Sequence, residues 1–426
     1  MGRNSGCLVL MIWLVLLVGV VGVVMAGVGV LRYGGVDGLV LRVRTEVIAR
    51  QDHPDFVLKP SANPDIDVAA FADQLDAPPG STPVPDAANV RLVSSEVIPV
   101  HEGTEPTVLL TGFQHIWQTW NNCGPATLAM NLSFYTAAPD QAQVASVLKP
   151  NRDDKNVNPQ EMVAYAMNQG FRAKALVNGD TERLKLLLSN QIPVLMETWL
   201  EEEPNDGLGH YRMMIGYDEA AQNWIAADSY VGTNQLNPEG AYRGIRVPYA
   251  GMDEMWGVFN RTYVVVYPED KAQLVQSIIG DDMNEQAMWQ RTFERFQNEI
   301  TARPNDPYAW FNLGSALVAL GQYDQAATAY DQARHIGLPW RMLWYQFGPF
   351  QAYYESGRFQ EVIDLANATA NSGGEIEEIY YWKGRAQVAL GDEAAARSSW
   401  ERALALKPTY ADAMAALASL NGPAGP

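Results

Sequence analysis

The C-terminal third of the 426-residue chain repeats its own residue pattern, and this limits the folds open to that region. Eight residues have counterparts 70 positions later, a distance equal to two 34-residue units plus two residues. The first set is Trp310, Leu313, Gly314, Gly321, Tyr323, Ala326, Tyr330 and Ala333, and the second is Tyr380, Lys383, Gly384, Gly391, Glu393, Ala396, Trp400 and Ala403. Because a period of roughly 20–50 residues is typical of stacked repeats, the sequence predicts an all-α solenoid over residues 271–426.

The spacing resembles that of tetratricopeptide repeats (TPRs). In that pattern small residues let paired helices approach closely, and aromatic residues fill the layer between them. The resemblance implies a half-repeat cap at residues 284–303 and a closing helix at residues 410–420. It also implies that the repeats bind a protein partner or substrate.

The middle unit departs most from the repeat pattern, because two extra residues fall in or near its first helix. It is also rich in aromatic residues, namely Trp340, Trp344, Tyr345, Phe347, Phe350, Tyr353 and Tyr354. Aromatic side chains at helical spacing are usually buried, so we expect this surplus to fill a widened layer of the repeat core. The alternative is that part of it seals the repeats against the preceding domain or a substrate protein.

The N-terminal region, residues 1–50, contains an uncharged apolar run of 25 residues from Cys7 to Leu31. About 20 apolar residues suffice for a helix to cross a bilayer, so we expect a single-pass transmembrane helix that anchors the protein in the cell membrane. A cleaved secretory signal, ending near Ala26, is the alternative. In either case we expect the rest of the chain to lie outside the cytoplasm, and the proline-rich residues 51–106 to form a linker.

Charge and cysteine content exclude several classes of function. Acidic residues outnumber basic ones 49 to 30, giving a net charge of −19, which argues against nucleic-acid binding. The chain has only two cysteines, Cys7 and Cys123, which excludes a disulfide framework and a zinc cluster of thiolates. No residue spacing suggests a metal ion or another cofactor.

Residues 107–270 combine helical stretches with short apolar, β-branched runs at 192–196, 213–217 and 263–267. This mixture predicts an α+β domain. Within it, Cys123 begins the run Cys-Gly-Pro-Ala, and Pro125 is well tolerated in the first turn of a helix. We therefore expect Cys123 at a helix N-terminus, where the helix dipole and a nearby imidazolium lower the pKa of a thiol. The amide of Gln118 and the backbone N–H of Cys123 would form an oxyanion hole.

A nucleophilic cysteine needs a base and a group that orients the base. Two of the five histidines, His115 and His210, lie in this domain. His210 opens one predicted strand and Asp228 closes the next, with a turn at residues 218–222 between them. The two positions are symmetric about Glu219, which lies inside that turn. The spacing predicts that His210 and Asp228 lie directly opposite each other in an antiparallel hairpin, so that the carboxylate orients the imidazole.

With these residues assembled, the domain resembles the bacteriocin-processing peptidases that remove double-glycine leaders, which are papain-like cysteine peptidases. The resemblance covers residues 110–268 and rests on Asn-Asn-Cys123-Gly-Pro-Ala, Gly-His210-Tyr and Ala-Asp228-Ser-Tyr. It implies a papain-like α+β fold in which Cys123 is the nucleophile, His210 the general base, Asp228 its orienting partner and Gln118 the oxyanion donor. Gln114 is a minor alternative to Gln118, and relatives often have proline at position 229, where this chain has serine.

We expect an exported, membrane-tethered cysteine peptidase whose repeats recruit protein partners or substrates. A second hypothesis is a non-catalytic adaptor in which both the peptidase-like domain and the repeats bind peptide or protein. A third is transamidation or amide hydrolysis of a non-peptide substrate by the same thiol chemistry.

Overall fold

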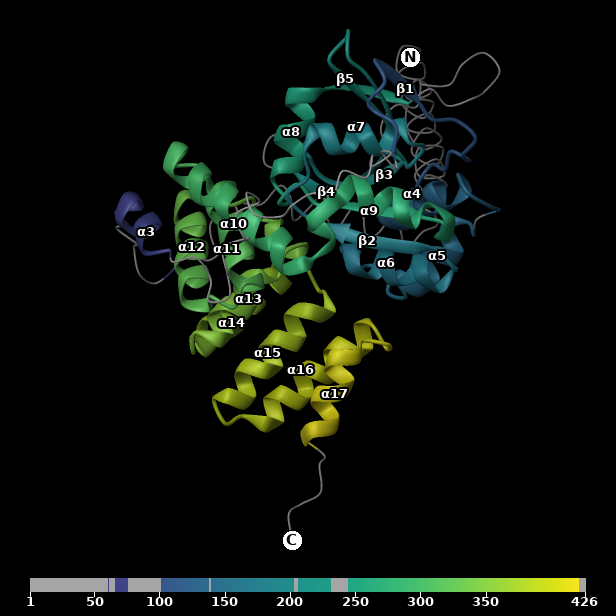
Figure 1. Cartoon of the computed structure of the whole chain (residues 1–426). Coiled ribbons are helices and arrows are strands. Elements are labelled where there is room, and N and C mark those ends of the chain that lie inside the picture. The colour runs from purple at the N-terminus through teal and green to yellow at the C-terminus, as the bar shows by residue number, and fades with distance from the viewer. Residues whose placement is uncertain are drawn as a thin grey trace, which may run out of the picture.

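The computed structural model describes residue 60 and residues 66–75, 101–137, 139–202, 206–230 and 244–420. Figure 1 shows a domain that contains a β-sheet, followed by paired helices that run on to the C-terminus. This order agrees with the α+β domain and the helical repeats predicted from the sequence.

The α+β domain is built on one sheet in which every described pair of strands is antiparallel. The strands are β1 (Thr107–Leu109), β2 (Arg172–Leu176), β3 (Val194–Leu200), β4 (Leu208–Asp218), β5 (Asn223–Ala227), β6 (Ile245–Pro248) and β7 (Tyr263–Tyr267). They follow the order β2-β7-β3-β4-β5-β6, and β1 pairs with β4. The apolar runs predicted as strands correspond to β3, β4 and β7, whose residues are almost all buried.

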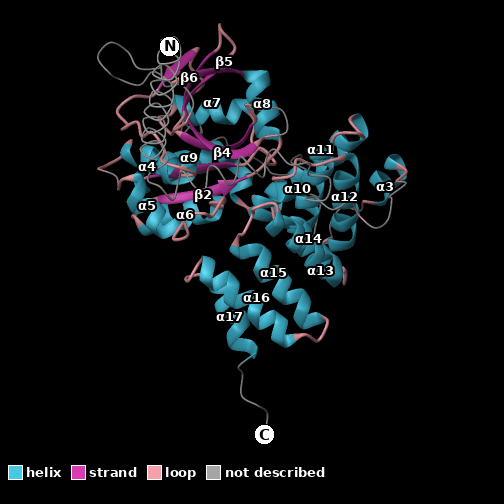
Figure 2. Ribbon diagram, turned by 180° about the vertical axis from the view of Figure 1, so that it is seen from behind, coloured by secondary structure: helices cyan, strands magenta, loops and turns pink. Residues whose placement is uncertain are grey.

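Helices cover this sheet (Figure 2). They are α4 (Cys123–Ser133), α5 (Gln141–Leu148), α6 (Pro159–Asn168), α7 (Thr181–Ser189), α8 (Tyr249–Gly257) and α9 (Ala272–Ile279). Helix α9 lies after the domain boundary predicted at residue 270, yet Val275, Ile278 and Ile279 pack in the core of the α+β domain. The short 3-10 helices η2 (Glu269–Lys271) and η3 (Gly280–Met283) flank α9.

The repeat region contains a leading helix, three helix pairs and a closing helix. They are α10 (Glu285–Ala302), α11 (Pro307–Ala319), α12 (Tyr323–Ile336), α13 (Gly348–Glu355), α14 (Phe359–Asn371), α15 (Glu377–Ala389), α16 (Glu393–Leu406) and α17 (Ala411–Leu420). The glycines of the repeat pattern lie where two helices meet. A Cβ atom on Gly314 would lie 2.8 Å from the Tyr330 ring, and one on Gly384 would lie 2.4 Å from the Trp400 ring.

The middle unit has an irregular first half. Its first helix, α13, has 8 residues, whereas the corresponding helices α11 and α15 have 13 each. The residues before α13 form a loop with one 3-10 turn, η4 (Met342–Trp344). Both interpretations of the aromatic surplus hold for part of it, because Phe350 and Tyr353 fill the repeat core while Tyr345 packs against the α+β domain.

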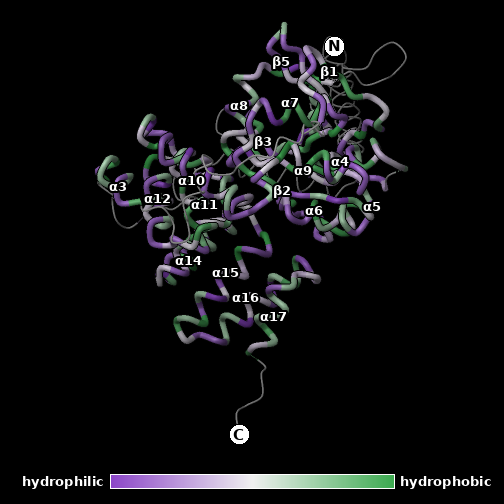
Figure 3. The backbone as a smooth tube through the Cα atoms, viewed as in Figure 1, coloured by the Kyte–Doolittle hydropathy of each residue, from purple (hydrophilic) through white to green (hydrophobic). Residues whose placement is uncertain are grey.

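The hydrophobic core of the repeats includes residues of both regions. Figure 3 shows hydrophobic stretches of the backbone in the α+β domain and in the paired helices. Trp199, Val258 and Phe259 belong to the α+β domain by sequence but pack among the residues of the repeat core. A further contact comes from the predicted linker, in which α3 (Val68–Gln74) lies against the repeats. The Phe71 ring lies 5.6 Å from the Trp310 ring, measured between centroids. The linker therefore includes a helix that packs on the repeats.

None of the helices in the described ranges is both long and apolar enough to cross a membrane. The transmembrane helix predicted at residues 7–31 lies outside the described residues.

Candidate active site

Cys123 is the first residue of helix α4, as the sequence predicts. The loop before it is held by side-chain hydrogen bonds, since Asn122 Nδ2 donates to Thr119 Oγ1 at 2.8 Å and the Thr119 backbone N–H donates to Gln141 Oε1 at 2.9 Å. No side chain caps this end of α4. Cys123 therefore lies at the positive end of the helix dipole, which favours the ionised form of a thiol.

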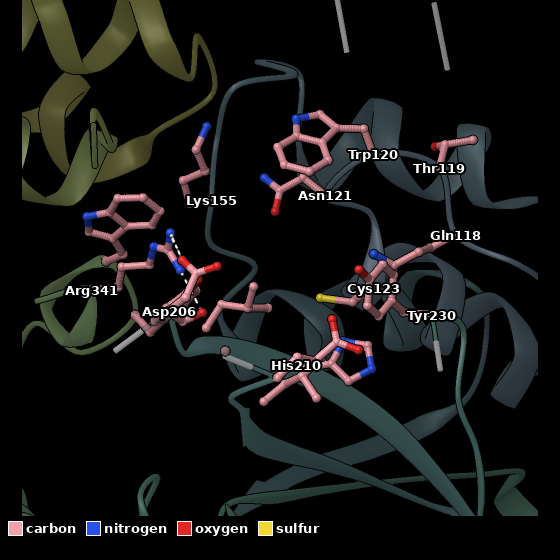
Figure 4. Close-up of a pocket in the computed structure, with 16 residues that line it drawn as sticks. Gln118, Thr119, Trp120, Asn121, Cys123, Lys155, Asp206, His210, Tyr230 and Arg341 are labelled. Atoms are coloured by element: carbon pink, nitrogen blue, oxygen red, sulfur yellow. Dashed lines mark hydrogen bonds and ion pairs between the residues drawn. The ribbon is translucent and has the colours of Figure 1, made fainter. Parts of the chain in front are cut away.

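His210 lies near the start of strand β4 and is 1% exposed. Its Nε2 atom lies 2.9 Å from Asp228 Oδ1, and the backbone N–H of Tyr230 donates to the same oxygen at 2.8 Å. Figure 4 shows the side chains of His210 and Cys123 close together among the residues that line one cavity. The carboxylate thus holds one ring nitrogen and leaves the other for the thiol.

The register of the hairpin differs from the prediction. Met213 pairs with Ala227, which places Arg212 rather than His210 opposite Asp228, and the register shifts by one residue between Met214 and Gly216. The direct opposition of His210 and Asp228 was therefore wrong. The two side chains still meet because His210 and Arg212 are two residues apart and project from the same face of the strand.

Arg212 is a residue of this site that the sequence analysis missed. Its Nε atom donates to Asp228 Oδ2 at 2.8 Å, and its Nη1 atom donates to Thr198 Oγ1 at 2.6 Å. Arg212 and Asp228 are 3% and 0% exposed. A buried unpaired charge destabilises the folded state. The ion pair with Arg212 offsets this cost for the Asp228 carboxylate and fixes its orientation.

The charges around the thiol favour its ionised form. Burial raises the pKa of Cys123, but the hydrogen bond and charge of His210 outweigh it, with help from the Tyr211 backbone and Lys149, so that the net pKa is lowered. Burial lowers the pKa of His210, but the charge and hydrogen bond of Asp228 raise it to about 9. The two shifts favour a thiolate and imidazolium pair at neutral pH.

Gln118 lines the same cavity as Cys123 and His210. Its side-chain oxygen accepts a hydrogen bond from Ser229 Oγ at 2.8 Å, and its backbone N–H donates to the Ser229 carbonyl at 2.8 Å. Ser229 thereby leaves the amide nitrogen as the donor toward the thiol (Figure 4). Gln114, the alternative, donates its backbone N–H to Ser133 Oγ at 2.8 Å and lies further back along the chain.

Glu197, on strand β3, is a second residue that the sequence analysis missed. It is 3% exposed and lines a small cavity behind Cys123 together with Lys149 and Tyr345. Burial, and then the negative charge of Cys123, raise the pKa of Glu197 to about 8, so that the carboxyl group is protonated at neutral pH. The sequence carries a signal for it, because Glu197 is the one charged residue of β3.

The wider cavity around the thiol is lined by both parts of the chain. Its lining consists of Gln118, Thr119, Trp120, Asn121, Cys123, Lys155, Leu200, Glu202, Asp206, Leu208, Gly209, His210, Tyr230, Arg341, Trp344 and Tyr345. Within the described ranges, no group of three or more His, Cys, Asp and Glu side chains is arranged to hold a metal ion.

Comparison with known proteins agrees with this architecture. Residues 110–245 match the model of the Peptidase_C39 like family, and residues 307–336 and 377–410 match tetratricopeptide repeat models. The chain therefore contains a C39-like peptidase domain followed by TPRs, and the irregular middle unit lies between the two matched repeats. None of the curated proteins matches the chain.

Three solved structures resemble parts of the chain. A C39-like peptidase from Bacillus anthracis is 16% identical, with a TM-score of 0.31, over 39% of this chain and 99% of the other. A double glycine motif protease from an AMS/PCAT transporter, in complex with the leader peptide, is 21% identical, with a TM-score of 0.27, over 38% of this chain and 99% of the other. MamA from Desulfovibrio magneticus RS-1 is 18% identical, with a TM-score of 0.30, over 36% and 84%.

The pairing of Cys123 with His210 predicts a thiol that reacts at low pH. Iodoacetamide should alkylate Cys123 at about pH 6, where an ordinary thiol of pKa about 8.5 is almost wholly protonated. His210→Ala should slow this alkylation roughly tenfold or more, because it removes the hydrogen bond and the charge that favour the thiolate. His335→Ala, in the repeats, is the matched control and should react like the wild type. Equal slow rates in the wild type and His210→Ala, matching a model thiol, would contradict the activation of Cys123.

Burial of Glu197 predicts a pH-dependent stability. The pKa of this group is about 8 in the folded protein against an ordinary value of 4.5, so the folded state binds more protons between these values and loses stability as pH rises. Glu197→Gln does not titrate. The melting temperature of Glu197→Gln minus that of the wild type should therefore increase between about pH 4.5 and pH 8. Above pH 8 this difference should stay constant.

Thermal unfolding followed by circular dichroism at pH 5, 6, 7, 8 and 9 would measure this difference. Glu254→Gln, at an exposed position, is the control and should follow the wild type at every pH. A difference between Glu197→Gln and the wild type that does not change with pH would show that Glu197 keeps an ordinary pKa.

Proposed function

We propose that the protein is a cysteine peptidase that hydrolyses peptide bonds, held outside the cytoplasm by its N-terminal segment. The observation that supports this is that Cys123 of α4, His210 of β4 and Gln118 line one cavity, and that Asp228, directly after β5, bonds the His210 ring. Each has the chemistry that acyl transfer needs at its position. The TPRs, in this proposal, bring protein substrates or partners to the site.

The first half of the reaction forms an acyl-enzyme. The Cys123 thiolate attacks the carbonyl carbon of the peptide, and the negative charge that develops on the oxygen is stabilised by the Gln118 amide and the Cys123 backbone N–H. The His210 imidazolium then protonates the leaving amine as the C–N bond breaks. Asp228 keeps the ring in the orientation that this transfer requires.

The second half returns the enzyme to its starting state. Neutral His210 removes a proton from water, and the resulting hydroxide attacks the thioester carbonyl. The C–S bond breaks, which releases the carboxylic acid product and the Cys123 thiolate. The net reaction consumes one peptide bond and one water molecule, and Cys123 and His210 return to their starting protonation states.

The assignment of Gln118 predicts different effects on turnover and on thiol reactivity. Gln118→Ala should lower kcat for a peptide substrate about 10²–10³-fold, because it removes one oxyanion donor. Its alkylation by iodoacetamide should stay near the wild-type rate, because that reaction forms no oxyanion. Gln114→Ala is the matched control for loss of a nearby glutamine, and Cys123→Ala sets the background. A wild-type protein that alkylates rapidly yet binds peptides without cleaving them would favour the adaptor hypothesis.

The apolar N-terminal segment predicts that the protein is attached to a membrane. If residues 7–31 form an uncleaved anchor, the full chain should stay with membranes after carbonate extraction and retain its N-terminal peptide in mass spectrometry. A variant that lacks residues 1–50 should appear in the soluble fraction. A soluble product that begins at Gly27 would instead show that the segment is a cleaved secretory signal.

A further inference from the structure

The irregular half of the middle repeat places a loop against the α+β domain. Helix α12 ends at Ile336, before Gly337 with its φ of +130°, and α13 begins only at Gly348. Residues 338–347, which we call the docking segment, lie between them and start with Leu338-Pro339. The first helix of this repeat thus has 8 residues where the corresponding helices have 13, and the residues before it make a different contact.

The docking segment is fixed next to the catalytic strand. The Tyr345 ring packs on the backbone of Gly209, where an added Cβ atom would lie 2.9 Å from a ring carbon. The same ring lies 6.3 Å from Trp199 and 6.1 Å from Phe259, measured between centroids. Gly209 directly precedes His210, so the contact reaches the residue beside the proposed base.

An ion pair between buried Arg341 and partly exposed Asp206 holds the other end of the segment. Arg341 Nη2 lies 2.5 Å from Asp206 Oδ1, and Arg341 Nη1 donates to the backbone carbonyls of Asp206 and Gly207 at 2.9 and 3.1 Å (Figure 4). The Arg341 side chain is 3% exposed. Through these bonds Arg341 fastens the segment to the residues that lead into strand β4.

Trp344 lies between these two contacts and faces the cavity. It lines the same cavity as Cys123 and His210, together with Arg341 and Tyr345. Its indole Nε1 donates to Ser372 Oγ at 2.8 Å, and the side chain is buried in a small cluster with Trp340 and Ile376. The indole is therefore held in one orientation by the repeats while it forms part of the wall of the cleft.

The residues around Trp344 in the cavity indicate which kind of substrate side chain would bind there. The charge of Arg341 is matched by Asp206, and the charge of Lys155 is matched by Asp153. The remaining groups on this side of the cavity include the aromatic residues Trp344 and Tyr345 and the aliphatic residues Leu200 and Leu208. An apolar side chain buried there would gain hydrophobic contact, whereas an acidic one would lose its hydration and meet the carboxylate of Glu202, which also lines the cavity.

We propose that the docking segment is the specificity wall of the peptidase, with Trp344 seating an apolar side chain of the substrate next to the scissile bond. The repeats would then select the substrate inside the cleft in addition to recruiting protein partners. This inference rests on the proposed peptidase function, because it assigns a role in recognising the peptide that Cys123 attacks.

The test uses the full chain and peptidyl chloromethyl ketones that differ in a single side chain, leucine, alanine, glutamate or lysine, at the residue beside the reactive group. The Cys123 thiolate displaces chloride from these probes, and mass spectrometry gives the labelling rate. The wild type should prefer the leucine probe to the glutamate probe about tenfold or more. Trp344→Phe and Trp344→Leu should reduce this preference about fivefold or more, with unchanged labelling by iodoacetamide.

Trp400→Phe is the matched control. Trp400 is also 3% exposed, and its indole Nε1 donates to the Tyr381 carbonyl at 3.0 Å, but it lies in the third repeat away from the cavity. It should keep the wild-type preference. A preference in both Trp344 variants within twofold of the wild type, with the fold intact by circular dichroism, would overturn the specificity wall alone. Wild-type labelling by iodoacetamide no faster than that of a model thiol would overturn the peptidase function and the wall with it.

Discussion

The buried carboxylate of Asp228 is the group on which the candidate site depends. It is 0% exposed and bonds His210 through one oxygen and Arg212 through the other. Asp228 raises the pKa of His210, and the charge of Arg212 acts in the opposite direction. Asp228 and Arg212 together therefore set the pKa of the His210 imidazole. The charge of the imidazole in turn sets how much of the Cys123 thiol is ionised.

Strand β4 links this chemistry to the arrangement of the two domains. His210 and Arg212 lie on it, Gly209 receives the Tyr345 ring, and the residues just before it receive Arg341. A displacement of the repeats would therefore move the start of the strand that carries the proposed base. The shared core at Trp199 and Phe259 resists such a displacement, since separation of the domains would expose these large apolar side chains.

Much of the site could be predicted from sequence because its signals are local. The position of Cys123 at a helix start follows from the residues around it, and the TPR pattern follows from small and aromatic residues at fixed spacing. The register of the hairpin was missed because Asp218 pairs with Asn223, which centres the pairing between positions 220 and 221 and not on Glu219. The irregularity between Met214 and Gly216 then moves the pairing by one residue, which sets Arg212 opposite Asp228. The role of Arg212 depends on that register. The docking of Tyr345 on Gly209 joins residues 136 positions apart, and no local pattern encodes such a contact.

The repeats contact the peptidase domain both before and after the docking segment in the chain. These contacts limit how far Trp344 can move relative to Cys123. Arg295 Nη1 donates to Asn178 Oδ1 at 2.8 Å before the segment, and Lys407 pairs with Glu161 of helix α6 after it. Lys407 is 7% exposed and also lies 2.9 Å from Glu377, so this pairing is part of a buried charge cluster. A solenoid free at one end could swing, because each repeat contacts only its neighbours. Fixed at both ends, the arc of helices keeps Trp344 at a set position relative to the thiol, which is the condition for a side chain to discriminate between substrates.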